Sequence, residues 1–166
     1  MNIETVKSIG TFVILLLAQA LVLNHIHLFN CATPFLYVYM VLHFQRNAPK
    51  WSLLLWSFLM GLLVDVFSNT PGVAAGSMAF IGFIQPYLLE LFAPRDSADD
   101  LVPSRKTFGG RSFFYYSLTI VFIYCLIFFT LETFNFFNWL QWIFSILGSM
   151  VLSLALIYAI ENLRKN

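Results

Sequence analysis

Hydrophobic residues are grouped along the chain in six segments, which short polar stretches separate. The segments cover residues 9–23, 34–44, 51–67, 73–92, 112–131 and 139–160. At about 1.5 Å per residue, the longer segments would form helices of about 26 to 33 Å, which matches the hydrocarbon thickness of a bilayer. Helices are expected because lipid offers the backbone no hydrogen-bond partners and alternating ten-residue strands are absent. The pattern therefore predicts an all-α integral membrane protein, a bundle of six transmembrane helices.

The first two segments differ from the others. Lys7, an apolar run and the triplet AQA at residues 18–20 are also typical of a cleavable signal peptide. The apolar run continues to Leu23, however, which favours a retained helix. The second segment (residues 34–44) is short, and polar residues interrupt the chain before it. We expect a short helix that its neighbours shield from lipid, preceded by a partly buried loop over residues 31–34.

The basic residues distinguish the two sides of the membrane. If the amino terminus is cytoplasmic and the chain crosses six times, all nine Lys and Arg residues fall on the cytoplasmic side. They are Lys7, Arg46, Lys50, Arg95, Arg105, Lys106, Arg111, Arg164 and Lys165. The opposite connections, at residues 25–33, 68–72 and 132–138, carry none. This split follows the positive-inside rule, and it predicts that both termini and the 93–111 loop are cytoplasmic.

Composition excludes two broad classes of protein. The chain is 60% hydrophobic and 10% charged, whereas soluble domains are nearer half apolar and a quarter charged. A chain of 166 residues cannot bury so much apolar surface in water. A net charge of +1 gives no broad electrostatic attraction to nucleic acid. We therefore interpret residues 1–166 as a single transmembrane helical domain that contacts membrane lipids and does not bind nucleic acid.

Motifs that carry catalysis are absent from the sequence. It contains no phosphate-binding glycine loop, no zinc-type cluster and no nucleophile elbow. His25 and His27 would form half of a metal site at most, and we interpret them as interfacial side chains. Cys31 and Cys125 match no redox or metal spacing, so we expect buried small residues unless the fold pairs them. The prediction is a protein that is not an enzyme and has no catalytic residues, metal or cofactor.

The most informative region is the sequence GLLVDVFSNTPGVAAG, from Gly61 to Gly76. Ser57, Gly61 and Asp65 recur at i, i+4 and i+8, so they form one narrow stripe on the third helix. Glycine lets a neighbouring helix approach closely, and a carboxylate at membrane depth should face protein or water rather than lipid. We therefore expect this stripe to face another element of the protein.

Three roles are open for Asp65. It could accept hydrogen bonds from the amides of residues 72–74 and pin the third helix to the fourth, with Thr70 and Pro71 as cap and first residue. It could instead handle a solute or a proton, or it could contact a partner protein. Gln19 is expected at about the same depth, so a hydrogen bond between Gln19 and Asp65 is a further hypothesis.

Small residues form two further stripes. Gly72 and Gly76 have GxxxG spacing at the start of the fourth helix. Ser145, Ser149 and Ser153 follow one face of the sixth. Both stripes favour close helix packing. The packing is either internal or a docking face for another membrane helix.

Other polar residues lie toward the cytoplasmic side. Gln85 precedes Pro86 within a predicted helix, and we interpret it as the partner of the carbonyl that proline leaves free. Glu90 is expected to pair with Arg95. The loop over residues 93–111 is either simply solvated or docks a cytoplasmic partner or anionic head groups.

Together these residues resemble the family of the bacterial rod shape-determining protein MreD over essentially the whole chain. The resemblance rests on the small size, the six hydrophobic segments and the short second segment after a proline. It also rests on a third helix that ends in Gly-x-x-x-Asp, here Gly61 to Asp65, followed by the Pro71-Gly72 turn and a small-residue helix start. The stretch FFTLETF, from Phe128 to Phe134, also looks like members of the family.

The resemblance implies a non-enzymatic component of the cell-elongation machinery in the bacterial inner membrane, which helps to control cell shape and lateral peptidoglycan synthesis. Family members associate with MreC, a membrane-anchored periplasmic protein, and cooperate with the MreB filament, RodA and its partner transpeptidase. The family fold is similar to the substrate-binding component of energy-coupling-factor transporters. The residues that we expect to serve structure or partner binding are Ser57, Gly61, Asp65, Pro71, Gly72, Gly76 and Gln19.

The likeness to a transporter component defines an alternative function. The chain would then be a small-solute-binding membrane subunit, with Asp65 and Gln19 lining an outward-open pocket. The sequence has neither repeated halves nor an obvious pair of broken helices, which argues against autonomous transport. We therefore expect a scaffold that binds MreC, with the transporter subunit as the alternative.

Overall fold

The computed structural model describes residues 3–21, 33–94, 100–133 and 138–163. Among these residues the regular structure is entirely α-helical, in seven helices. They are α1 (Ile3–Leu21), α2 (Val38–Leu42), α3 (Lys50–Ser68), α4 (Val73–Phe92), α5 (Arg105–Phe108), α6 (Gly110–Thr133) and α7 (Trp139–Leu163). The prediction of an all-α fold is confirmed for this part of the chain.

Four helices, α3, α4, α6 and α7, are long and apolar enough to cross a bilayer. They contain 19, 20, 24 and 25 residues, which corresponds to about 28 to 38 Å at the helical rise. A shorter apolar helix, Ile9–Leu21, lies within α1. By length and composition the chain is therefore a multi-pass membrane protein.

The second predicted segment does not form a spanning helix. Residues 33–37 are non-helical, and α2 is a helix of only five residues, all of them buried. The expectation of a short helix that its neighbours bury is therefore confirmed, whereas the expectation that this segment adds a sixth transmembrane helix is wrong. Pro34 lacks an amide hydrogen and disfavours helical geometry at the residue before it, so the segment begins without a helix. The predicted 93–111 loop also differs from expectation, because it contains α5.

The turn between α3 and α4 has two left-handed residues. Asn69 ends α3 with a φ of 56°, and Gly72 precedes α4 with a φ of 85°. Asparagine and glycine are the residues that most readily adopt this conformation. The predicted cap at Thr70 and first position at Pro71 are wrong, because α4 begins at Val73 after Gly72.

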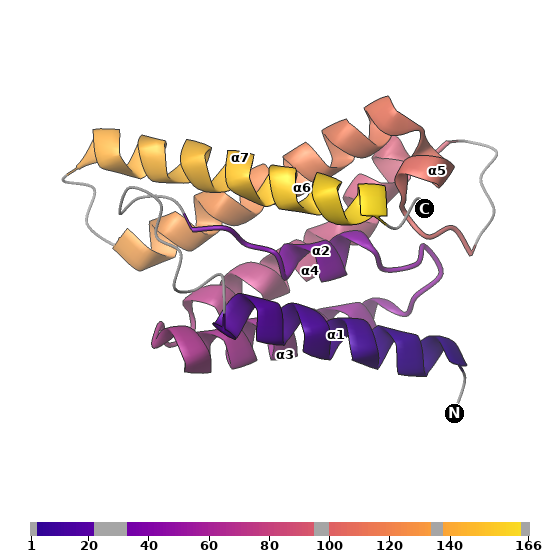
Figure 1. Ribbon diagram of the computed structural model, residues 1–166, viewed down its shortest axis with the longest axis horizontal. Helices are drawn as coiled ribbons and strands as arrows, with labels where there is room; N and C mark the ends of the chain where they lie inside the picture. The colour runs from indigo at the N-terminus through magenta and orange to yellow at the C-terminus, as the bar shows by residue number, and fades with distance from the viewer. Residues whose placement is uncertain (1–2, 22–32, 95–99, 134–137, 164–166) are drawn as a thin grey trace.

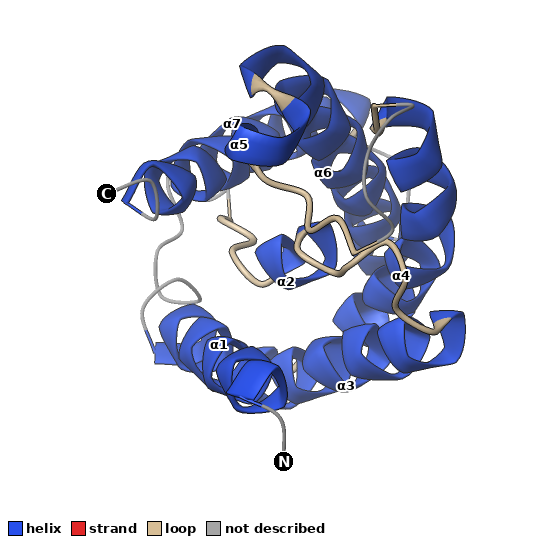
Figure 2. Ribbon diagram, turned by 90° about the vertical axis from the view of Figure 1, so that its right-hand side faces the viewer, coloured by secondary structure: helices blue, strands red, loops and turns tan. Residues whose placement is uncertain are grey.

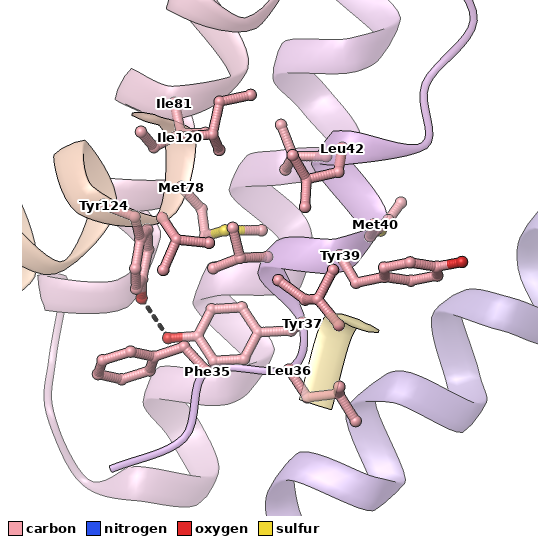
Figure 3. Packing of buried hydrophobic residues seen from close by; sticks show 14 of the residues in the cluster. Phe35, Leu36, Tyr37, Tyr39, Met40, Leu42, Met78, Ile81, Ile120 and Tyr124 are labelled. Atoms are coloured by element: carbon pink, nitrogen blue, oxygen red, sulfur yellow. Dashed lines mark hydrogen bonds between the residues drawn. The ribbon is translucent and has the colours of Figure 1, made fainter. Parts of the chain in front are cut away.

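The longer helices surround α2. Seen along the bundle in Figure 2, α1, α3, α4, α6 and α7 form a ring with α2 inside it. Within the ring α3 packs on α4, α4 on α6, α6 on α7 and α1 on α3. Figure 3 shows side chains of the 35–42 segment packed against Met78, Ile81 and Ile120 of α4 and α6. The core is therefore built around a segment in which only residues 38–42 are helical.

One end of the bundle carries the described basic residues. The start of α1, the connection from α2 to α3, helix α5 and the end of α7 lie at this end, on the right of Figure 1. The basic residues there are Arg46, Lys50, Arg105, Lys106 and Arg111. We call this the basic end. The turn between α3 and α4 lies at the opposite end, away from these basic residues, as predicted for the 68–72 connection.

Candidate functional site

Asp65 connects the end of α3 to the start of α4. Its side chain is buried, and its Oδ1 atom accepts hydrogen bonds from the Ala74 amide and the Thr70 hydroxyl, both at 2.9 Å. Its Oδ2 atom accepts one from the Ala75 amide at 2.8 Å. The first amides of a helix lack partners within the helix and carry partial positive charge, so a carboxylate satisfies them well. The predicted pinning is confirmed, with donors at Ala74 and, one residue beyond the expected range, Ala75.

The stripe of Ser57, Gly61 and Asp65 faces α4. A Cβ atom on Gly61 would lie 2.5 Å from the backbone oxygen of Ala74, which cannot move aside as a side chain could. The packing is reciprocal, because a Cβ atom on Gly82 of α4 would lie 2.8 Å from the Ser57 Oγ atom. Small residues on both helices thus let the two backbones approach closely. The expectation that this stripe faces another element is confirmed, and the element is α4.

Pro71, Gly72 and Gly76 occupy different surroundings. Pro71 and Gly72 are exposed in the turn, where the positive φ of Gly72 favours glycine. Gly76 is exposed in the first turn of α4, and a Cβ atom there would meet only the Leu131 Cδ1 atom, at an ordinary 3.7 Å. The two glycines therefore do not form a closely packed GxxxG face within the described part of the chain. Gly76 is therefore exposed rather than packed against another helix within the described residues.

Gln19 binds the non-helical segment before α2. The side chain is 2% exposed, and its Nε2 atom donates to the Pro34 carbonyl at 3.0 Å. Its Oε1 atom accepts from the Leu36 amide at 3.1 Å. A side-chain amide has both a donor and an acceptor. Gln19 can therefore satisfy a backbone carbonyl and a backbone amide of this segment at the same time. The hypothesis of a Gln19–Asp65 hydrogen bond is wrong, because within the described chain the Asp65 carboxylate is bonded by α4 and the turn before it.

Two serines of α7 bind the same segment from the other side. The Ser149 Oγ atom accepts a hydrogen bond from the Thr33 amide at 3.0 Å, and the Ser153 Oγ atom accepts one from the Phe35 amide at 2.9 Å. Irregular backbone at membrane depth is tolerated only where the protein satisfies its polar groups. The predicted serine stripe therefore has a partner within the chain, and that partner is non-helical backbone.

Aromatic side chains fill the space beside this segment. The Tyr37 and Tyr124 hydroxyls are hydrogen-bonded to each other, as Figure 3 shows. The Phe35 ring lies 5.1 Å from the Tyr124 ring and 4.7 Å from the Phe128 ring, measured between centroids. Cys125 is buried, as expected. These contacts join the non-helical segment to α6.

Gln85 joins α4 to α6. Its Nε2 atom donates to the buried Tyr116 hydroxyl at 3.0 Å. Pro86 lies inside α4, which continues to Phe92. The expectation that Gln85 would satisfy the carbonyl freed by Pro86 is wrong, because the amide reaches across to the neighbouring helix, where a buried hydroxyl needs a partner.

Sequence reasoning missed Glu161, a buried carboxyl group in the last turn of α7. Its Oε2 atom accepts from the Tyr39 hydroxyl at 3.0 Å, and its Oε1 atom accepts from the Arg105 amide at 3.1 Å. The hydrophobic pattern ends at Ile160, so Glu161 looks like part of the polar tail. The signal that could have found it is the four-residue spacing, because Glu161 lies on the same helix face as the buried Ser149 and Ser153.

The buried side chains of Asp65, Gln19 and Glu161, with those of Gln85 and the two α7 serines, thus hold segments of this chain together. The part of the chain that the structure describes contains no group of three or more side chains suited to binding a metal ion. His25, His27 and Cys31 lie outside the described residues. Arg95, the expected partner of Glu90, lies outside them too, and Glu90 itself is exposed.

The fold and these contacts define a class, a multi-pass helical membrane protein in which buried polar side chains bind non-helical backbone and helix ends. No protein-family model matches the chain, and neither does any curated protein or any solved structure. Its function is therefore inferred from its residues and their geometry.

Proposed function

We propose that this protein is a non-enzymatic scaffold of the bacterial cell-elongation machinery, of the MreD kind, which binds the membrane-anchored part of MreC. In this proposal it lies in the inner membrane with the basic end in the cytoplasm, and it acts through MreC on MreB, RodA and the partner transpeptidase. The sequence resemblance around Gly61, Asp65 and the Pro71-Gly72 turn supports the proposal. The positive-inside rule supports the orientation.

The observation that carries the proposal is a stripe on α4 that the described part of the chain leaves exposed, although the Lys50 ammonium group lies 5.0 Å from the centre of the Tyr87 ring at one end. Gly76, Phe80, Phe83 and Tyr87 follow one another at intervals of three and four residues, and all four are exposed. One end of the stripe is a glycine, which permits close approach of another helix, and the other three residues are aromatic. The rings of Phe83 and Tyr87 contact each other, with centroids 5.9 Å apart. A single membrane helix such as the anchor of MreC would fit along this stripe.

The internal contacts also favour a scaffold. Asp65, Gln19 and the α7 serines hydrogen-bond backbone groups of this chain, so these side chains stabilise the fold. The same contacts decide which glycine can test partner binding. A bulky residue at Gly61 would collide with α4 itself, and Gly72 has a positive φ. Of the three predicted glycines, only Gly76 can therefore be enlarged to test partner binding without disturbing the fold.

The test is co-purification of MreC with a Gly76→Leu variant from membranes. Leucine has a higher helix propensity than glycine, and a Cβ atom at this exposed position makes only an ordinary contact with the Leu131 side chain, so the variant should fold. We expect the recovery of MreC to fall roughly fivefold or more, within the range of coupling that membrane helix contacts provide. The matched control is Ala155→Leu, which enlarges an exposed small residue on α7 and should leave the recovery unchanged. Equal recovery with both variants would contradict the proposed surface.

One observation favours the alternative of a solute-binding subunit. Residues 33–37 are non-helical inside a ring of helices, and membrane transporters bind their substrates where helices are broken. The residues expected to line the pocket, Asp65 and Gln19, nevertheless have hydrogen bonds to this chain. A thermal-shift screen of the purified protein with vitamins and metabolites distinguishes the two functions. A saturable shift that Gln19→Leu abolishes would favour the solute-binding subunit.

A further inference from the structure

Glu161 is bonded by two segments that are far apart in the sequence. The Tyr39 hydroxyl reaches it from α2, in the centre of the bundle, and the Arg105 amide reaches it from α5, at the basic end. Each donor uses a different oxygen of the same carboxyl group. The side chain is 5% exposed, so water has little access to replace either donor. The three elements therefore meet at one group.

Helix α5 has a local structure of its own at both ends. Ser104 and Thr107 form a reciprocal capping box around its start, and Gly109 follows it with a φ of 77°. Arg105 of α5 makes a second contact besides its amide bond to Glu161. Its guanidinium group lies 5.0 Å from the centre of the Tyr158 ring on α7. The position of α5 thus depends on the contacts of Arg105 with α7 and on the buried Phe108 side chain, whose ring lies 5.5 Å from the Tyr116 ring of α6, measured between centroids.

On the α2 side, Tyr39 and the connection after α2 also have defined contacts. Tyr39 is buried, and its ring lies 4.5 Å from the His43 ring. The connection that follows α2 is linked to the segment before α5, because the Arg46 amide donates to the Leu101 carbonyl at 3.0 Å. Two separate links therefore join the end of the central segment to the same stretch of the basic end.

We propose that the Glu161 carboxyl group is a joint that couples the position of α5 to the packing of α2. A displacement of α5 turns or frees the carboxyl group, and the Tyr39 hydroxyl then loses its hydrogen bond to Glu161 and is left with its longer contact to the His43 Nε2 atom, at 3.5 Å. A displacement of α2 acts on α5 in the same way, because coupling between two sites is reciprocal. A contact made at the basic end would thereby reach the centre of the bundle.

The first test removes a single donor atom. Arg105→Pro deletes the amide hydrogen that bonds Glu161, and proline is well tolerated at the first position of a helix after an extended residue such as Ser104. The control Arg105→Ala removes the same side chain but keeps the amide. Hydrogen exchange of residues 38–42 is measured by mass spectrometry in nanodiscs. We expect Arg105→Pro to exchange roughly fivefold faster than Arg105→Ala, the lower range of energetic coupling between sites.

The second test works in the opposite direction. Tyr39→Phe removes the hydroxyl in α2, and the readout is the rate of tryptic cleavage after the exposed Lys106 in the same nanodiscs. We expect cleavage to accelerate roughly fivefold. The control is Tyr115→Phe, which removes an exposed hydroxyl on α6 and should change nothing.

Acceleration in both directions supports the joint. If Arg105→Pro does not fold, Tyr39→Phe decides alone, because it is a conservative change within a folded core. Unchanged cleavage after Lys106 in Tyr39→Phe would overturn the proposal, since Glu161 would then hold two segments independently.

Discussion

The α3–α4 hairpin and the segment over residues 33–42 meet the same physical demand by opposite means. Each has backbone groups inside the bundle that a regular helix would have satisfied. In the hairpin, Asp65 supplies the acceptors from nine and ten residues away along the chain. In the segment, Ser153 supplies an acceptor from a residue 118 positions away. The hairpin therefore satisfies its backbone groups locally, whereas the segment takes its partners from the first and last helices.

This difference predicts how each region responds to substitution. The hairpin depends on backbone contact between two long helices, so steric changes should affect it most. The segment depends on single hydrogen bonds from side chains, which in membranes contribute about 1 kcal/mol each. The following substitutions examine this contrast, from the largest expected effect to the smallest.

Gly61→Val should be the most damaging substitution. A Cβ atom there would approach Ala74 backbone to 2.5 Å, so α3 and α4 must separate along their main contact. We expect the free energy of unfolding to fall by more than about 3 kcal/mol, measured by denaturant titration in mixed micelles. Gly76→Val, at an exposed position in the same region, should change it far less. Similar values for the two variants would contradict the close packing at Gly61.

Asp65→Ala should follow. It leaves the Ala74 and Ala75 amides without their acceptor at a buried helix start. We expect a loss of about 2 kcal/mol in the same titration. Asp65→Asn keeps one acceptor oxygen and should lose about half as much. If the alanine and asparagine variants are both as stable as the parent, Asp65 does not hold the hairpin.

Gln19→Leu tests the segment from the α1 side. The change removes both hydrogen bonds to the backbone of residues 34–36 while it keeps apolar volume. We expect a loss of about 1.5 kcal/mol and faster hydrogen exchange at Leu36. Gln141→Leu is the matched control, because Gln141 is exposed on α7. Protection at Leu36 that survives Gln19→Leu would mean that the segment is held without α1.

Ser153→Ala and Ser57→Ala should have the smallest effects on the free energy of unfolding. The two variants compare a hydrogen-bonded serine with one that has no hydrogen bond within the described residues. The Ser153 hydroxyl accepts from the Phe35 amide, whereas the buried Ser57 Oγ atom has no hydrogen-bond partner within the described chain. Ser153→Ala should cost about 1 kcal/mol. Ser57→Ala should be neutral or slightly stabilising, because it removes an unsatisfied hydroxyl. A larger loss at Ser57 than at Ser153 would reverse the interpretation of both serines.

Periodicity and local spacing predict the hairpin well. Residues four apart on a helix share a face, so the stripe through Gly61 and Asp65 could be read directly, and a carboxylate one turn before a tight turn lies near the next helix start. The same reasoning placed Gln19 near Asp65 and was wrong. Depth in the membrane is common to many residues, whereas a hydrogen bond depends on which helices are neighbours.

Hydrophobic runs and charge distribution were enough to determine the class of this protein, because lipid imposes length and helicity on every spanning segment. They also determined the α3–α4 contact, whose partners are close in sequence. Only the tertiary structure decided that residues 33–42 fill the centre, that Ser149 and Ser153 bind them, and that Glu161 joins α2 to α5. These contacts join elements over sequence separations of 56 to 122 residues. Such pairings depend on the order in which helices surround the core, and no local pattern encodes that order.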